Sequence, residues 1–213
     1  MKILSEDKDV LVCIKEAGEL SERREGKPGK SVEDIYGSPL YTVHRLDRKT
    51  AGVTVYAKTP QAAALLSGQI RNGETEKRYF AVLRGEPVKE SEELTDYLVR
   101  DEKRNLTSVA DENTEGAKFA RLQYETAAVN QGLTLVKVRL LTGRTHQIRV
   151  QFSSRGTPVY GDSRYSGGRG ELALYSYLLE FNHPQTSERM RFTGMPDTEK
   201  FPWNLFEREV SAI

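Results

Sequence analysis

The 213-residue sequence predicts a single α+β domain built on a largely antiparallel mixed β-sheet with flanking helices. Three observations support this fold class. Short apolar or alternating runs typical of strands dominate the chain, helical patterns lie between them, and several connections are short enough for β-hairpins. A chain of this length can bury roughly 70% of its unfolded surface, so the fold needs no metal ion or disulfide for stability.

The first half of the chain predicts three strands and one helix. The runs that indicate strands are residues 9–14, 53–57 and 77–85. The helix lies between the second and third strands, where Thr59 can act as the N-cap and Pro60 as the first helical residue. It ends at Asn72 and Gly73, because both residue types tolerate a left-handed backbone.

The second half begins with a charge-rich segment, residues 86–118, which we interpret as a hairpin-like excursion with a possible strand at 95–99 and not as a second domain. Gly156 is expected to end a helix formed by residues 144–156. The apolar residues 172–181 fit either a strand or a helix. The remaining strands are expected at 119–129, at 133–141 and, as an edge strand, at 189–194.

Composition indicates a soluble globular protein, with 37% hydrophobic and 30% charged residues. The single cysteine, Cys13, cannot form an internal disulfide, which fits a reducing compartment. We find no apolar run long enough to span a membrane and no signal-peptide pattern at the N-terminus. These features predict a cytoplasmic protein that makes no membrane contact.

The net charge of +1 conceals a strong asymmetry along the chain. Residues 41–84 hold eight Lys or Arg and three Asp or Glu, and residues 131–170 hold seven and one. The segment between them, residues 85–130, has a net charge of −5, from six basic and eleven acidic residues. If the two basic blocks form one surface, they create a positive field suited to RNA or DNA. The alternative is that these basic residues are scattered and solvated.

The sequence HRLDRKTAG, residues 44–52, places one acid in a basic loop. Asp47 lies between Arg45 and Arg48, with His44 and Lys49 close by. Neighbouring cations favour the ionised carboxylate, and a loop at the edge of a sheet is a common place for a functional site. Asp47 is therefore either a nucleophile or a member of an ordinary surface salt bridge, which is the commoner case for a loop aspartate.

A second candidate segment is TGRTHQIR, residues 142–149. A helix that begins at Thr145 would direct free N–H groups toward a phosphate beside Arg144. His146 alone is more often a structural histidine. Arg149 follows the core-facing Ile148, so we expect it to be partly enclosed and to need a carboxylate partner.

Other chemistry is weakly indicated. Tyr79 lies in a predicted strand, where tyrosine is more often a core residue than a catalytic one. The three histidines have no zinc-like spacing, and no dinucleotide-binding or phosphate-loop motif is present. We therefore expect no cofactor and no metal. The residues alone do not specify a reaction.

Four ordered motifs resemble the RluA-type pseudouridine synthase family. HRLDRKTAGVTVYAKT resembles the family's HRLDxxTSGxxxxAK, and KRYFAVLRG resembles KxYxAxxxG. The segment TGRTHQIRVQFSSRGTPVYGDSRY resembles TGRTHQIRVHxxxxGxPixGDxxY, and LALYSYLLEFNHP resembles LALHAxxLxFxHP. The similarity extends from the first strand to about residue 196. This chain departs from the family pattern at Lys15-Glu16, Ala51, Gln151 and Tyr175.

The resemblance implies isomerisation of uridine to pseudouridine in rRNA or tRNA, without a cofactor, in a domain with a central RNA-binding cleft. It implies that Asp47 is the catalytic aspartate, that Tyr79 stacks on the base, and that Arg149 pairs with the aspartate. Because breaking the C1′–N1 bond requires a nucleophile or an ionised carboxylate near the sugar, these residue types suit the reaction. The candidate RNA contacts are His44, Arg45, Arg48, Arg144 and Arg155.

The domain organisation follows from the same comparison. We expect residues 1–213 to form one catalytic domain with no N-terminal S4-type domain, acting as a monomer. One alternative is a catalytically inactive RNA-binding or RNA-folding module. A metal-dependent nuclease is a weaker alternative, because residues 131–170 contain only one acid, Asp162.

Overall fold

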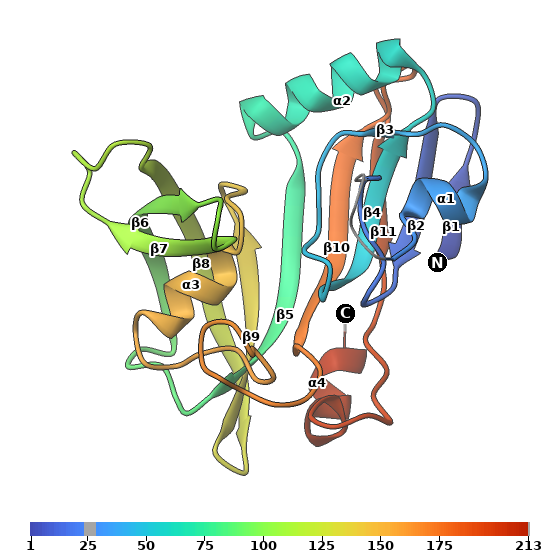
Figure 1. The fold of residues 1–213 in the computed structure, drawn as a ribbon. Coiled ribbons are helices and arrows are strands. Elements are labelled where there is room, and N and C mark those ends of the chain that lie inside the picture. Colours follow the sequence, from blue (N-terminus) through green and yellow to red (C-terminus); the bar gives the residue numbers. More distant parts are fainter. Residues whose placement is uncertain (24–28, 213) are drawn as a thin grey trace. The chain divides into compact units, whose positions relative to one another are not determined.

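The computed structural model describes residues 1–23 and 29–212, and these form two compact units (Figure 1). Unit 1 comprises residues 1–77 and 175–196, and unit 2 comprises residues 78–174 and 197–213. Strand pairing within each unit is largely antiparallel, and helices pack on the strands, so the α+β prediction is confirmed. Part of the polar segment around residues 26–31 lies outside the described residues.

Unit 1 has a mixed sheet whose strand order is β1-β2-β4-β10-β11, with β3 also paired to β4. Only the β4–β10 pair among these is parallel. The apolar segment that fitted either a strand or a helix is the strand β10. The strands are β1 (Lys2–Glu6), β2 (Val10–Lys15), β3 (Tyr41–Thr42), β4 (Ala51–Ala57), β10 (Leu174–Asn182) and β11 (Arg189–Thr193).

A helix covers each face of this sheet. Helix α2 (Pro60–Asn72) buries Ala62 and Leu66 against one face, and helix α1 (Val32–Tyr36) buries Val32 against the other. Successive side chains of a strand point to opposite faces, so burial on both faces explains the unbroken apolar run of β2. The predicted ends of α2 are confirmed. Thr59 Oγ1 accepts from the N–H of Ala62, and Gly73 follows the helix at φ 73°.

Gly52 allows the parallel pairing of β4 with β10. Its φ is 129°, and a Cβ added there would lie 2.3 Å from the carbonyl oxygen of Ser176. No other residue type fits this close approach of two backbones. Since Gly52 directly follows the loop that carries Asp47, the glycine fixes where that loop enters the sheet.

Unit 2 has an antiparallel sheet with the strand order β5-β9-β8-β6-β7. The charge-rich excursion is the β6–β7 hairpin, as predicted, and its strand β6 extends the sheet by pairing with β8. Helix α3 packs Val150 against Leu98 of β6 and Ala120 of β8. The elements are β5 (Glu76–Arg84), β6 (Ser91–Asp101), β7 (Leu106–Ala110), β8 (Lys118–Asn130), β9 (Leu133–Leu140), α3 (Gln147–Ser153), η1 (Trp203–Phe206) and α4 (Glu207–Ser211).

Helix α3 differs from its prediction. It spans Gln147–Ser153 and not residues 144–156. At its start, His146 has a φ of 57°, and this left-handed conformation interrupts the helix. The side chain of Gln147 turns back, and its Oε1 accepts from the N–H of Arg144 at 3.0 Å. The helix therefore begins two residues later than the expected phosphate-binding N-terminus at Thr145. In the part of the chain that the structure describes, no helix is long and apolar enough to cross a membrane.

Candidate active site

The loop between β3 and β4 holds Asp47 on a fixed main chain. On one side, Ser21 Oγ donates to the carbonyl of Leu46 and accepts from its N–H, at 2.9 and 3.0 Å. On the other side, the N–H of Gly18 donates to the carbonyl of Arg48 at 2.7 Å. The loop then closes with the N–H of Thr50 bound to the carbonyl of Asp47 at 3.0 Å. Because the main chain of Leu46 and of Arg48 is anchored, the half-buried Asp47 side chain projects from a rigid part of the loop.

The two arginines beside Asp47 have contacts within unit 1. Arg45 forms an ion pair with Glu22 at 2.6 Å, and its side chain is 43% exposed. Arg48 donates through Nε to the carbonyl of Gly18 at 3.1 Å. An exposed ion pair of this kind contributes little free energy. RNA phosphates can therefore compete for Arg45 at small cost.

A buried cation that is absent from the predicted site residues, Lys15, lies at the end of β2. Lys15 is 0% exposed, and its Nζ donates to the main-chain carbonyls of Glu16, Glu19 and Arg48 at 3.0, 3.0 and 3.4 Å. Burial lowers its pKa to about 8, against opposing attraction from nearby carboxylates that include Asp47. Lys15 thus ties β2 to the loop and places a positive charge near the candidate carboxylate. A lysine that ends a fully apolar strand was the signal for this role.

His44 is a neutral structural residue of the same loop. Its Nε2 accepts from the N–H of Val55 at 3.2 Å and lies 3.2 Å from Thr54 Oγ1. Burial, with a smaller effect of Lys77, lowers the pKa of His44 to about 3. His44 therefore has no positive charge to offer a phosphate near neutral pH. Any contact that it makes with RNA must use the neutral imidazole.

Tyr79 and Arg149 belong to unit 2. Tyr79 lies in β5 opposite Val138 of β9 and is 6% exposed. Arg149 is 5% exposed, so the expected enclosure is confirmed. Its carboxylate partner within this unit is Asp162, which binds Nε at 2.7 Å and Nη2 at 2.9 Å. Burial raises the pKa of Asp162, but hydrogen bonds and charge from Arg149 outweigh it and hold this pKa below its usual value.

The other two arginines predicted to bind RNA are differently placed in unit 2. Arg144 is exposed and donates through Nε to the carbonyl of Phe119 at 2.8 Å, a contact that leaves its charge unneutralised. Arg155 instead forms a two-point ion pair with Asp96, at 2.9 and 3.2 Å. Gln151 donates to the same carboxylate at 2.7 Å. The departure from the family pattern at Gln151 is therefore part of a buried polar contact with β6.

Asp7, Asp9 and His183 are close enough together to suggest a metal site among the described residues. The hydrogen bonds of His183 argue against it. Nδ1 accepts from the N–H groups of Gln185 and Thr186, so the ring proton lies on Nε2, which donates to Asp7 at 2.8 Å. A protonated nitrogen cannot coordinate a metal. This cluster instead fixes the turn between β10 and β11 against the turn between β1 and β2.

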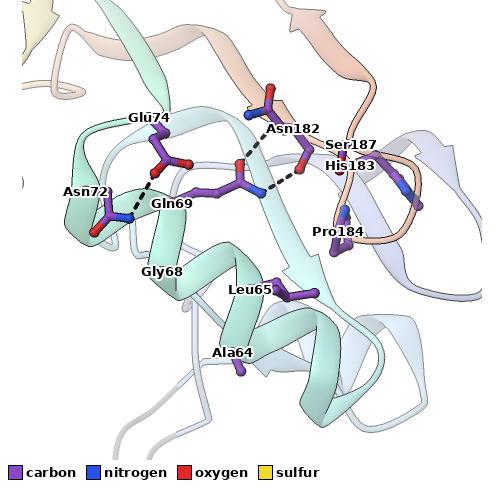
Figure 2. Close-up of a pocket in the computed structure, with 10 residues that line it drawn as sticks. All are labelled: Ala64, Leu65, Gly68, Gln69, Asn72, Glu74, Asn182, His183, Pro184 and Ser187. Carbon is purple, nitrogen blue, oxygen red and sulfur yellow. Dashed lines mark hydrogen bonds between the residues drawn. The ribbon is translucent and has the colours of Figure 1, made fainter.

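A pocket in unit 1 lies between α2 and the turn after β10 (Figure 2). Gln69 forms a two-way contact with the main chain of Asn182, with both hydrogen bonds at 2.8 Å. Asn72 and Glu74 bind one another at its rim at 2.9 Å. None of the predicted site residues lines this pocket, so we assign the candidate chemistry to the loop of Asp47 and not to this surface.

The predicted site residues thus fall into two groups. His44, Arg45, Asp47 and Arg48 share one loop of unit 1. Tyr79, Arg144, Arg149 and Arg155 belong to unit 2. The first group offers a carboxylate on a rigid loop. The second group offers a tyrosine and a buried arginine whose orientation is fixed by a carboxylate.

Comparisons with known proteins identify relatives across most of the chain. The family model described as RNA pseudouridylate synthase matches residues 6–154. An uncharacterized RNA pseudouridine synthase of Bacillus subtilis, YjbO, is 36% identical over 206 residues, which cover 90% of this chain and 71% of that protein. The ribosomal large subunit pseudouridine synthase C of Yersinia pestis is 31% identical and is matched over 92% of this chain and 66% of its own length.

A solved structure supports the fold. The structure of human RNA pseudouridylate synthase domain containing 4 matches 99% of this chain and 93% of its own, with a TM-score of 0.78. Its sequence identity to this chain is 20%, so the likeness concerns the fold alone.

Proposed function

Because the chain belongs to the RluA type of the RNA pseudouridine synthase family, we propose that Asp47 is the carboxylate with which it isomerises uridine to pseudouridine. The observation that carries this proposal is the anchoring of the main chain on both sides of Asp47 by Ser21 and Gly18. A reacting carboxylate must hold its position to a fraction of an ångström, and a loop anchored in this way provides that precision.

The reaction is an isomerisation, so the elemental composition of the uridine does not change. The bond between C1′ of the ribose and N1 of the base breaks, the base turns, and a new bond joins C1′ to C5. The hydrogen on C5 is released as a proton, and N1 gains one. Asp47 supplies negative charge beside the sugar when the first bond breaks.

The family motifs add Tyr79 and Arg149 to the proposed catalytic group. An aromatic face at Tyr79 can hold the detached base while it turns, without a covalent bond to it. Arg149 carries a permanent positive charge, and the family motifs pair this arginine with the catalytic aspartate. The burial of Arg149 and its two-point contact with Asp162 support a fixed position for that charge.

The substrate is a uridine within structured RNA, which the enzyme must extrude at a cost of a few kcal/mol. Phosphate contacts of Arg45, Arg48, Arg144 and Arg155 would offset this cost, and His44 would contribute through its neutral ring. Relatives named for the large ribosomal subunit favour rRNA as the target, with tRNA as the second candidate. We expect a cytoplasmic monomer that needs no cofactor.

Release of tritium from RNA labelled at C5 of uridine tests this proposal, because isomerisation replaces that hydrogen. Purified protein is incubated with ribosomal RNA and, separately, with tRNA, and the products are mapped by mass spectrometry. The expected result is release at defined uridines in one RNA class. Binding without release from either RNA would instead favour the inactive RNA-binding module.

A further inference from the structure

We propose that Tyr165 is a positioning residue, which holds the Arg149 guanidinium and connects it to the β6–β7 hairpin. The inference rests on the proposed role of Arg149. It adds a role for the β6–β7 hairpin, which lies outside the four family motifs and supports Arg149 through Tyr165. Every contact used in the argument lies within unit 2.

The first step is the fixed orientation of Arg149. Asp162 binds Nε and Nη2, and the same carboxylate accepts from the N–H groups of Arg164 and Tyr165 at 3.0 and 3.2 Å. Its side chain is 0% exposed. A planar guanidinium held at two nitrogens by a buried carboxylate cannot rotate without breaking both contacts. Asp162 therefore sets the plane of the guanidinium and also shapes the loop that carries Tyr165.

The second step is the position of the Tyr165 ring. The guanidinium carbon of Arg149 lies 5.2 Å from the centre of this ring, within the range of a cation–π contact. The ring of His146 meets Tyr165 edge-on, with the ring centres 5.6 Å apart. Tyr165 thus contacts both Arg149 and His146, the residue that precedes α3.

The third step is the hydroxyl group of Tyr165. The oxygen accepts from the N–H of Thr107 in β7 at 2.9 Å and lies 2.8 Å from His146 Nδ1. A phenol oxygen has one hydrogen to donate and can accept more than one hydrogen bond, so it can bind the N–H of Thr107 and Nδ1 of His146 at the same time, whichever of the two side chains donates. The hydroxyl therefore joins the hairpin to His146, whose left-handed backbone at φ 57° sets the start of the helix that carries Arg149.

Two further contacts attach the hairpin to the same region. Arg164 Nη1 donates to the carbonyls of Arg104 and Asn105, at 3.2 and 2.7 Å, in the turn of the hairpin. Arg100 of β6 binds Thr145 Oγ1 at 3.4 Å and Asn105 Oδ1 at 3.0 Å. The hairpin is therefore part of the support of the α3 segment, and Tyr165 is its most direct connection to Arg149.

Replacement of Tyr165 by phenylalanine separates the contact of its ring with Arg149 from the hydrogen bonds of its hydroxyl group. The ring and its contact with Arg149 remain, but the links to Thr107 and His146 are lost. Small displacements of a catalytic group lower turnover steeply, so we expect kcat to fall between roughly 10-fold and 100-fold. Substrate affinity depends mainly on phosphate contacts and should change little, so KM should stay near its wild-type value.

Tyr124→Phe is the matched control. Tyr124 is a buried tyrosine beside α3, whereas Tyr165 is half-buried. The ring of Tyr124 meets Phe152 edge-on, and its hydroxyl donates to the carbonyl of Lys89 at 2.9 Å. Both variants lose one hydroxyl with a main-chain partner, and their melting temperatures should fall by similar amounts. Only Tyr165→Phe should lose kcat, since Tyr124 has no part in the contacts that hold Arg149.

The experiment measures kcat, KM and melting temperature of the full chain for both variants and for Arg149→Met, on the same tritiated RNA. The inference is supported if Tyr165→Phe loses kcat at a near-constant KM while Tyr124→Phe keeps its activity. A Tyr165→Phe enzyme with wild-type kcat overturns the inference, as does an equal loss of kcat in both tyrosine variants. An active Arg149→Met enzyme would instead refute the proposed role of Arg149 itself.

Discussion

Arg149 and Asp162 form a buried two-point ion pair, in which Nε lies 2.7 Å from Oδ2 and Nη2 lies 2.9 Å from Oδ1. The side chains are 6% and 0% exposed. Such a pair adds little net free energy, because removing both charges from water costs about as much as their attraction returns. Removing only one partner leaves the other as an uncompensated buried charge, and this asymmetry has a measurable consequence.

Arg149→Met should abolish turnover and lower the free energy of unfolding by about 3–5 kcal/mol. The double variant Arg149→Met with Asp162→Leu should be less destabilised, because no buried charge remains. Chemical denaturation at neutral pH gives both free energies. If the single variant unfolds like the wild type and still isomerises uridine, Arg149 is an ordinary helix residue.

The same pair predicts a loss of stability in acid. The pKa of Asp162 in the folded protein lies below its ordinary value because Arg149 favours the ionised form, despite burial. A lowered folded pKa gives stability that is present above the unfolded pKa, which is about 3.9. That stability is lost as pH falls through the folded pKa. The variant with both Arg149→Met and Asp162→Leu should lack this pH-dependent stability. If the wild type and the double variant lose stability equally in acid, the pair does not cause the loss.

Lys15→Met should lower turnover, because three carbonyls around the Asp47 loop lose their donor. Each unsatisfied buried acceptor costs about 1–3 kcal/mol. The folded pKa of about 8 lies below the ordinary 10.5, so stability from Lys15 should increase as pH rises between these values. Lys58→Met is the control, since Lys58 binds Glu6 and the carbonyl of Asp7, away from the loop. Comparable losses of turnover in Lys15→Met and Lys58→Met would show that Lys15 has no specific role in supporting the Asp47 loop.

RNA binding should weaken steeply with salt. Each phosphate neutralised on single-stranded RNA contributes a slope of about −0.7 in log K against log salt concentration. Arg144→Ala should reduce the slope by about that amount, because its contact with Phe119 is to a carbonyl and leaves the charge available. Arg155→Ala should reduce it less, since Arg155 is already paired with Asp96. Titration at several salt concentrations tests this order, and an unchanged slope in Arg144→Ala would contradict it.

Elements set by local chemistry were predictable from the sequence. The ends of α2 follow from Thr59 and Gly73, whose effects act within one turn of the helix. The strands β2, β4, β5, β8, β9 and β11 follow from apolar runs and alternation, whereas β1 and β3 were not predicted. The hairpin-like excursion expected at residues 86–118 contains the β6–β7 hairpin.

Elements set by distant contacts were not predictable in the same way. The start of α3 depends on the left-handed backbone of His146, which binds Tyr165 nineteen residues later. Residues 172–181 contain a strand because β4 and β11 pair with it, and a periodicity argument contains no information about those partners.

In the candidate site, too, local features were predictable and contacts between distant residues were not. The sequence indicated that Arg149 is enclosed and needs a carboxylate, but Asp162 was identified as a partner only by the structure. Lys15 was passed over because a charged residue at a strand end is usually solvated, whereas this one is enclosed by the loop that it anchors. The catalytic assignments of Asp47, Tyr79 and Arg149 came from the family motifs and remain proposals.

The central claim is that Asp47 performs the chemistry, and turnover by purified Asp47→Asn tests it most directly. Asparagine has nearly the same shape, so the anchored loop, the melting temperature and RNA affinity should stay close to those of the wild type. It has no negative charge, so pseudouridine formation should be undetectable by tritium release and mass spectrometry. Appreciable pseudouridine formation by this folded, RNA-binding variant would contradict the account.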